Sequence, residues 1–191
     1  MSQATIKPTL EITPRRLGLY ERKMRRSPNV RKAREAERAA KAYRLAAQNY
    51  SQLVAKATPM QIIELERSGV QGTLIKDMSR QMEMPSSRLF TILGIPKATA
   101  EKKAAAGELV KGSGGQAAVG MMRLLCMAQE IVANSTASQA QGFDSAKWLG
   151  QWIERPQPAL GGRKPADLID TPTGVELVAR LLGSLESGAY Q

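Results

Sequence analysis

The chain has 191 residues, one cysteine and no histidine, and its 28 Lys and Arg against 17 Asp and Glu give a formal net charge of +11. The missing histidine excludes Ser–His and Cys–His catalysis and histidine-containing metal sites, and the single cysteine excludes an internal disulfide and a multi-cysteine zinc site. Carboxylate or lysine chemistry stays open to an enzyme, and the sequence has no Gly-rich phosphate loop. We identify no candidate catalytic residue, metal site or cofactor site.

The composition favours an all-α protein. Hydrophobic residues make up 42% of the chain but aromatic residues only 4%, so Leu, Ile, Val, Ala and nine Met must fill the core. Ala-rich stretches with helical spacing point to helices. No apolar run approaches the roughly 18 residues of a membrane span, and the N-terminus lacks the apolar segment of a signal peptide. We expect a cytoplasmic protein without a membrane segment.

The positive charge is concentrated at the N-terminus. Residues 1–50 hold 13 Lys and Arg against 4 Asp and Glu, a net +9, whereas residues 51–191 carry a net +2. Such asymmetry indicates contact with nucleic acid or another polyanion, the alternative being a solvated helix face. From about Arg31 to Lys56, apolar residues recur at alternating spacings of four and three, which predicts a helix that either self-associates or packs on its own domain. Residues 1–56 are thus predicted to be a basic arm followed by an Ala-rich helix.

Residues 57–135 are predicted to form a helical region. Thr58, Pro59 and Gln61 have the spacing of a capping box, and the helix that they begin ends at Ser68-Gly69. Its predicted core residues are Met60, Ile62, Ile63 and Leu65. A second helix is predicted from about Thr73 to Met82.

Ser86 to Ala105 is the candidate helix-turn-helix. A short helix to Leu93 is followed by Gly94, which permits a sharp turn, by Ile95 as an anchor, and by a helix from Pro96 to about Ala106. An ordinary helix pair has the same pattern. The available contacts to DNA are Lys97, Thr99, Lys102 and Lys103. Thr99 has the chemistry to reach a base edge and the lysines to hold phosphates, and Glu101 on the same helix opposes them.

A glycine-rich break is predicted from Gly107 to Gly115, and a long core helix from about Gln116 to Asn134. That helix has one apolar stripe, and its methionines and Cys126 are interpreted as packing residues.

Residues 136–191 are predicted to be a second helical module. Asp144 is the expected N-cap of a helix containing Trp148 and Trp152, with Phe143 and Trp148 at hydrophobic-staple spacing. Pro156 and Pro158 end that helix, and Gly161-Gly162 form a turn. The last helix begins near Thr171 to Thr173, with Thr173 and Glu176 as a predicted capping box, and Gly188 is its expected stop.

The C-terminal sequence resembles the toxin-binding domain of Xre/ParS/MbcA-type antitoxins. The resemblance rests on Trp148-Leu149, on the run Pro158 to Pro165 (PALGGRKP), on Asp167 to Thr171 (DLIDT), and on Gly188-Ala189-Tyr190. It is dense over about the last fifty residues, looser over Thr58 to Ala133, and absent from residues 1–50. Leu89 to Ile95 followed by Thr99 likewise resembles the Xre-type DNA-binding motif, although Pro96 stands where a capping Ser or Thr is usual.

The resemblance implies an antitoxin that performs no chemistry. Its expected partners are a RES-domain toxin that consumes NAD and the operator DNA of its own operon, bound as a homo-oligomer such as a dimer. The tail Gly188, Ala189, Tyr190 and Gln191 is the expected toxin-binding segment, because a tyrosine ring, its hydroxyl and the terminal carboxylate suit a nucleotide pocket. Two alternatives remain: a stand-alone helix-turn-helix transcription regulator, and an RNA- or nucleoid-binding accessory protein that uses the basic arm.

Overall fold

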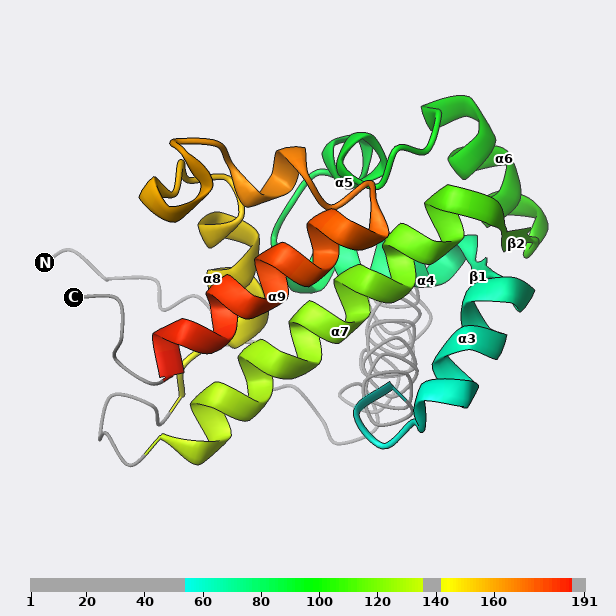
Figure 1. Cartoon of the computed structure of the whole chain (residues 1–191). Helices are drawn as coiled ribbons and strands as arrows, with labels where there is room; N and C mark the ends of the chain where they lie inside the picture. The colour runs from blue at the N-terminus through cyan, green and yellow to red at the C-terminus, as the bar shows by residue number, and fades with distance from the viewer. Residues whose placement is uncertain (1–53, 136–141, 187–191) are drawn as a thin grey trace, which may run out of the picture. The chain divides into compact units, whose positions relative to one another are not determined.

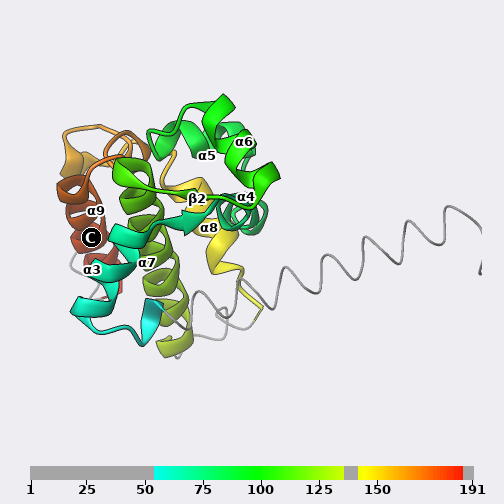
Figure 2. The same ribbon diagram turned by 90° about the vertical axis from the view of Figure 1, so that its right-hand side faces the viewer.

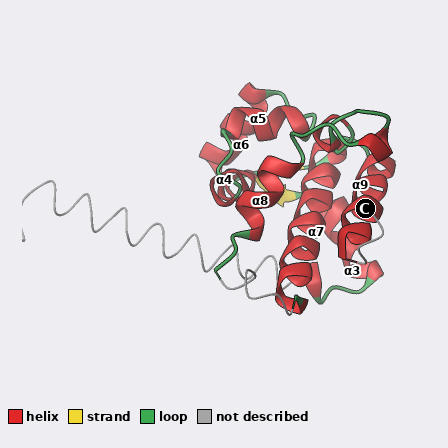
Figure 3. Cartoon of the chain, turned by 90° about the vertical axis from the view of Figure 1, so that its left-hand side faces the viewer, coloured by secondary structure: helices red, strands yellow, loops and turns green. Residues whose placement is uncertain are grey.

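A computed structural model describes residues 54–135 and 142–186 (Figure 1). Within them the chain is helical apart from one short two-stranded ribbon, which confirms the predicted all-α class (Figure 3). The elements are, in chain order, α3 (Pro59–Ser68), β1 (Val70–Gln71), α4 (Gly72–Gln81), α5 (Ser86–Ile92), α6 (Lys97–Ala106), β2 (Leu109–Val110), α7 (Gly112–Asn134), α8 (Ser145–Trp152), the 3-10 turns η2 (Pro158–Leu160) and η3 (Pro165–Asp167), and α9 (Pro172–Glu186). The basic arm and the Ala-rich helix up to residue 53 lie outside the described residues.

Helix α3 begins as the sequence predicts but faces the core differently. The Thr58 hydroxyl accepts a hydrogen bond from the Gln61 N–H at 3.3 Å, and the Gln61 side chain accepts one from the Thr58 N–H at 2.8 Å. The capping box is therefore confirmed. Met60 and Ile63 were expected in the core but are 64% and 39% exposed. The reason is that α3 packs on α7 with one side only. That side carries Ile62 and Leu65, which are half-buried, and Met60 and Ile63 lie on the other side.

The two strands were not foreseen from the sequence. β1 and β2 pair antiparallel with Val70 opposite Val110 and Gln71 opposite Leu109. A strand of two residues is too short to show an alternating pattern, so no periodic signal marks it. The ribbon ties the start of α4 to the start of α7.

Helix α7 is the centre of the described fold. It contacts α3, α8 and α9, and in Figure 1 it runs diagonally from the lower left to the upper right (Figure 2 gives the view from the side). Its predicted apolar stripe is confirmed, since Met121, Leu124 and Leu125 are all at most 4% exposed. Cys126 is also buried, and burial foremost raises the pKa of its thiol to about 11, which fits a packing residue.

The glycines before Gln116 belong to α7, so the predicted break over residues 107–115 is too long. A side chain on Gly114 would place its Cβ 2.5 Å from Ile95 Cγ1, and one on Gly115 would place its Cβ 2.6 Å from the Val110 carbonyl oxygen. These glycines are explained by the close approach of the first turn of α7 to its neighbours. The helix therefore begins at Gly112 rather than at about Gln116.

One hydrophobic core serves residues from both the middle and the C-terminal parts of the chain. Ile75, Leu89, Phe90 and Leu93 from the middle share this core with residues of α8 and α9. Gly150 lies so close to the Met82 carbonyl oxygen that a Cβ there would be 2.4 Å from it. The division of the sequence at 56/57 and 135/136 into three regions stays a prediction. No helix of residues 54–135 or 142–186 is long and apolar enough to cross a membrane.

Candidate functional site

The predicted helix pair of residues 86–106 forms, with a tight turn between α5 and α6. Gly94 has a φ of +64°, and the Ile95 N–H donates to the Phe90 carbonyl oxygen at 2.8 Å. Ala100 and Ala104 are the buried residues of α6. Their small side chains allow close packing on α4, where a Cβ on Gly72 would lie 2.7 Å from the Ala104 nitrogen. The side of α6 opposite Ala100 and Ala104 therefore faces the solvent.

Three of the four predicted DNA-binding residues are exposed on α6. Lys97, Thr99 and Lys102 are exposed, whereas Lys103 is half-buried. The Lys103 ammonium donates to the Leu109 carbonyl oxygen at 3.0 Å and lies 3.5 Å from a Glu108 carboxylate oxygen. Lys103 therefore stabilises the connection from α6 to β2, through contacts that the sequence pattern does not predict. Helical spacing places Thr99 and Lys102 on one side of α6 and Lys97 nearer to Glu101.

Helix α8 begins as predicted. The Asp144 carboxylate accepts a hydrogen bond from the Lys147 N–H at 2.9 Å, and the rings of Phe143 and Trp148 lie 6.3 Å apart. The N-cap and the hydrophobic staple are thus confirmed. Trp148 stacks on Trp152 with ring centroids 5.8 Å apart. Of the two, Trp152 is buried at 6% exposure and Trp148 is only half-buried.

The segment between α8 and α9 folds back on α8. The Gln157 N–H donates to the Arg163 carbonyl oxygen at 3.0 Å, closing a loop in which Gly161 and Gly162 have φ values of +64° and +79°. The Ala166 N–H then donates to the Ile153 carbonyl oxygen at 2.9 Å. The predicted glycine turn is confirmed, and the loop directs the chain into α9.

Helix α9 begins at Pro172, and its cap is Thr171. The Thr171 hydroxyl accepts a hydrogen bond from the Gly174 N–H at 3.1 Å, so the predicted Thr173–Glu176 capping box is wrong by two residues. The register is fixed by Gly174, because a Cβ there would meet the Leu168 carbonyl oxygen. The predicted toxin-binding residues Gly188, Ala189, Tyr190 and Gln191 lie outside the described residues.

An ion-pair cluster joins α5 to the C-terminal segment. Arg88 donates from Nε to Glu154 Oε1 at 2.6 Å and from Nη2 to Glu154 Oε2 at 3.1 Å, and Lys164 Nζ lies 3.4 Å from the same Oε2. The hydrogen bond from Arg88 is the main cause that holds the pKa of Glu154 below its ordinary value. Sequence reasoning missed this cluster, because Arg88 and Glu154 are 66 residues apart and no local pattern connects them.

Replacing Glu154 with Gln should lower stability at neutral pH and not in acid. A carboxylate with a depressed folded pKa stabilises the fold above its unfolded pKa of about 4.3, and that stability is lost as the pH falls through the folded pKa. We expect Glu154→Gln to cost about 1 kcal/mol at pH 7, because the cluster is partly exposed. Urea unfolding of both proteins from pH 7 to pH 3 measures this. A difference that stays constant over that range would contradict the assignment.

The described residues hold no cluster of three or more His, Cys, Asp or Glu arranged to bind a metal ion.

Two comparisons place this chain among known proteins. Residues 140–188 match the family described as the antitoxin Xre/MbcA/ParS C-terminal toxin-binding domain, which covers α8, the looped segment and α9. A protein named "Prs ADP-ribosylating antitoxin", from Sphingobium sp. (strain YBL2), is 31% identical over 135 residues, which are 71% of this chain and 84% of that protein. The similarity thus extends well ahead of the toxin-binding domain. The chain belongs to the Xre/MbcA/ParS-type antitoxins.

Proposed function

We propose that this antitoxin binds and inhibits a RES-type toxin that consumes NAD. The observation that carries the proposal is the match of residues 140–188 to a toxin-binding domain, on elements that are folded and capped as described above. The name of the Sphingobium relative refers to ADP-ribosylation, a reaction that uses NAD as the donor, and this supports an NAD-consuming toxin. Inhibition occurs by occlusion: the tail that follows α9 enters the toxin's substrate site. The antitoxin itself performs no chemistry.

The proposal predicts that a neighbouring reading frame encodes a RES-domain toxin. The test is co-expression with that protein, followed by purification through a tag on it. A complex that survives gel filtration supports the proposal. A RES-domain toxin that elutes alone, from cells that contain both proteins, contradicts it.

The same chain represses its own operon by binding operator DNA. The support is the outward face of α6 with its exposed Lys97, Thr99 and Lys102, together with the +9 charge of residues 1–50. A homodimer would place two copies of α6 about 34 Å apart, on half-sites one turn of DNA distant. Lysine contacts to phosphates release counterions, so this binding weakens steeply as the salt concentration rises.

Lys102→Glu should weaken operator binding and flatten its salt dependence. Each lost phosphate contact reduces the slope of log K against log salt by about 0.9, so a homodimer that loses one contact on each copy of α6 should lose about 1.8. Lys103 is left intact, since its ammonium holds the α6–β2 connection and its loss would disturb the fold. The measurement is fluorescence anisotropy with operator DNA at several salt concentrations. Arg155→Glu, an exposed residue after α8 with the same charge change, is the control. An equal loss in both variants would show a general charge effect instead of a contact by α6.

A further inference from the structure

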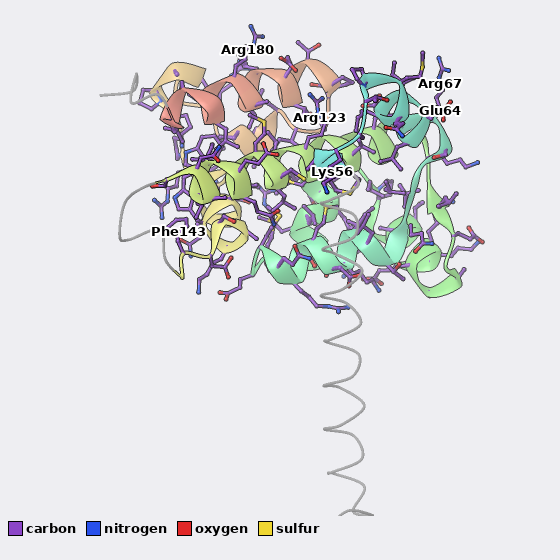
Figure 4. The ribbon with its side chains drawn as sticks, turned by 90° about the horizontal axis from the view of Figure 1, so that it is seen from below. Lys56, Glu64, Arg67, Arg123, Phe143 and Arg180 are labelled. Atoms are coloured by element: carbon purple, nitrogen blue, oxygen red, sulfur yellow. The ribbon has the colours of Figure 1, made fainter. Side chains whose placement is uncertain are left out.

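Arg123 is an exposed charge on a helix that is otherwise covered. From Ala117 to Cys126, every residue of α7 except Arg123 is buried. Helices α3 and α9 both pack on α7, and Gly120, one turn before Arg123, lies under Val175 of α9. The guanidinium group of Arg123 therefore reaches the surface between two helices that leave this position open. Figure 4 shows it on the same side of the molecule as Arg67 of α3 and Arg180 of α9.

Each flanking helix carries exposed apolar side chains one turn before an arginine. On α3, Met60 and Ile63 are 64% and 39% exposed, and Arg67 follows Ile63 by four residues. On α9, Leu177 is 41% exposed and Arg180 follows it by three residues. Residues three and four apart share one side of a helix, so each arginine lies beside the apolar group. We name these six residues (Met60, Ile63, Arg67, Arg123, Leu177, Arg180) the arginine face.

The three arginines have unused hydrogen-bonding capacity. Within residues 54–135 and 142–186, none of Arg67, Arg123 and Arg180 takes part in an ion pair or a side-chain hydrogen bond, in contrast to Arg88. Helices α3 and α9 also carry Glu64, Glu66, Glu176 and Glu186, so the positive charge of the face is that of its three arginines alone. Arginine offers a planar fork of donors that suits carboxylates, and it is enriched among the residues that dominate protein–protein binding energy.

We propose that the arginine face is a docking surface for the toxin, with Arg123 at its centre donating to a carboxylate of the toxin. This inference rests on the proposed function and extends it. Helix α9 lies in the region that matches a toxin-binding domain, whereas Arg123 and α3 lie ahead of that region, so the interface reaches beyond residues 140–188. The exposed Met60, Ile63 and Leu177 favour a protein over nucleic acid as the occupant, because apolar side chains gain nothing from a phosphate backbone. The outward residues of α6 belong to a different helix, which lies away from α3 and α9 at the top of Figure 2.

The experiment measures the affinity of the full chain for the RES-domain toxin by biolayer interferometry, with Arg123→Glu as the test variant. Lys102→Glu is the matched control, because it is an exposed residue with the same charge change outside the arginine face. We expect Arg123→Glu to weaken binding at least about tenfold and Lys102→Glu to leave it unchanged. Leu177→Ser should also weaken it, and thermal unfolding should show that all three variants keep the stability of the original chain.

Three results separate the possibilities. Binding of Arg123→Glu and Leu177→Ser at the original affinity would overturn the inference and leave the proposed function standing. Equal weakening by Arg123→Glu and Lys102→Glu would also overturn it, because overall charge would then be the cause. A toxin that fails to bind even the unsubstituted chain would contradict the proposed function, and with it this inference.

Discussion

An antitoxin that lacks Ala189, Tyr190 and Gln191 should fold normally, bind operator DNA normally and leave the toxin's NAD-consuming activity free. The removed tail follows Leu181, Leu182 and Leu185, the last apolar residues of α9 in or against the core, so we expect the described fold to keep its core without the tail. In the proposed mechanism the ring and the hydroxyl of Tyr190 occupy a pocket that otherwise takes part of a nucleotide. Because the arginine face and the rest of the C-terminal module are intact, the complex itself should still assemble.

The measurement is NAD loss catalysed by the purified complex, compared between the truncated and the full-length antitoxin. Gln191→Ala is the control, since it keeps Tyr190 and the length of the tail. We expect background NAD loss with the control and restored loss with the truncation. Complete inhibition by the truncated antitoxin would mean that the tail is a terminus without a role in occlusion.

Trp152→Ala should be the most damaging single truncation in the C-terminal module. Trp152 is 6% exposed and lies in the common core, and truncating a buried large aromatic residue costs about 3–5 kcal/mol. That is a large share of a typical stability of about 5–15 kcal/mol. Trp148→Ala should cost less, because Trp148 is only half-buried. That substitution removes the stacking on Trp152 and the contact with Phe143, but less buried area than Trp152→Ala removes.

Guanidinium unfolding of the two variants and the original chain gives the loss in free energy of unfolding for each substitution. The pair is its own control, because the same side chain is removed at positions four residues apart. A larger loss for Trp148→Ala than for Trp152→Ala would contradict the burial described here. Loss of toxin affinity by Trp148→Ala at unchanged stability would reassign Trp148 to the interface.

Three local features at helix ends were predicted correctly from the sequence. They are the capping box of Thr58 and Gln61, the N-cap and hydrophobic staple around Asp144, and the turn at Gly94. Each depends on residues close together in the sequence, so local chemistry determines it. The apolar stripes of α4 and α7 were also predictable, since each is long enough for its period to be read.

Features that depend on distant neighbours could not be predicted in this way. Gly114 and Gly115 suggest a break, yet they lie in α7. They are glycines because Ile95 and Val110 leave no room for a side chain. Lys103 reads as a phosphate contact like Lys102, but the Leu109 carbonyl oxygen holds its ammonium. In the same way, the cap of α9 shifts to Thr171 because Gly174 must pass close to Leu168.

The dependence on distant neighbours also explains why one candidate site could be predicted from the sequence and the other could not. The motif residues of α6 could be identified from the sequence, whereas the arginine face requires three helices to lie together and has no sequence pattern of its own. Arg123 in particular reads as a polar residue on the solvated side of α7. Only the packing of α3 and α9 on α7 shows why Arg123 is the one exposed residue of α7 between Ala117 and Cys126.

The most direct test is a titration of the full-length chain into its proposed partner, a RES-domain toxin, with NAD loss as the readout. The account predicts that NAD loss falls to background once the antitoxin reaches a fixed stoichiometric ratio, and that further antitoxin has no effect. NAD loss that continues unchanged in a molar excess of folded antitoxin would contradict it.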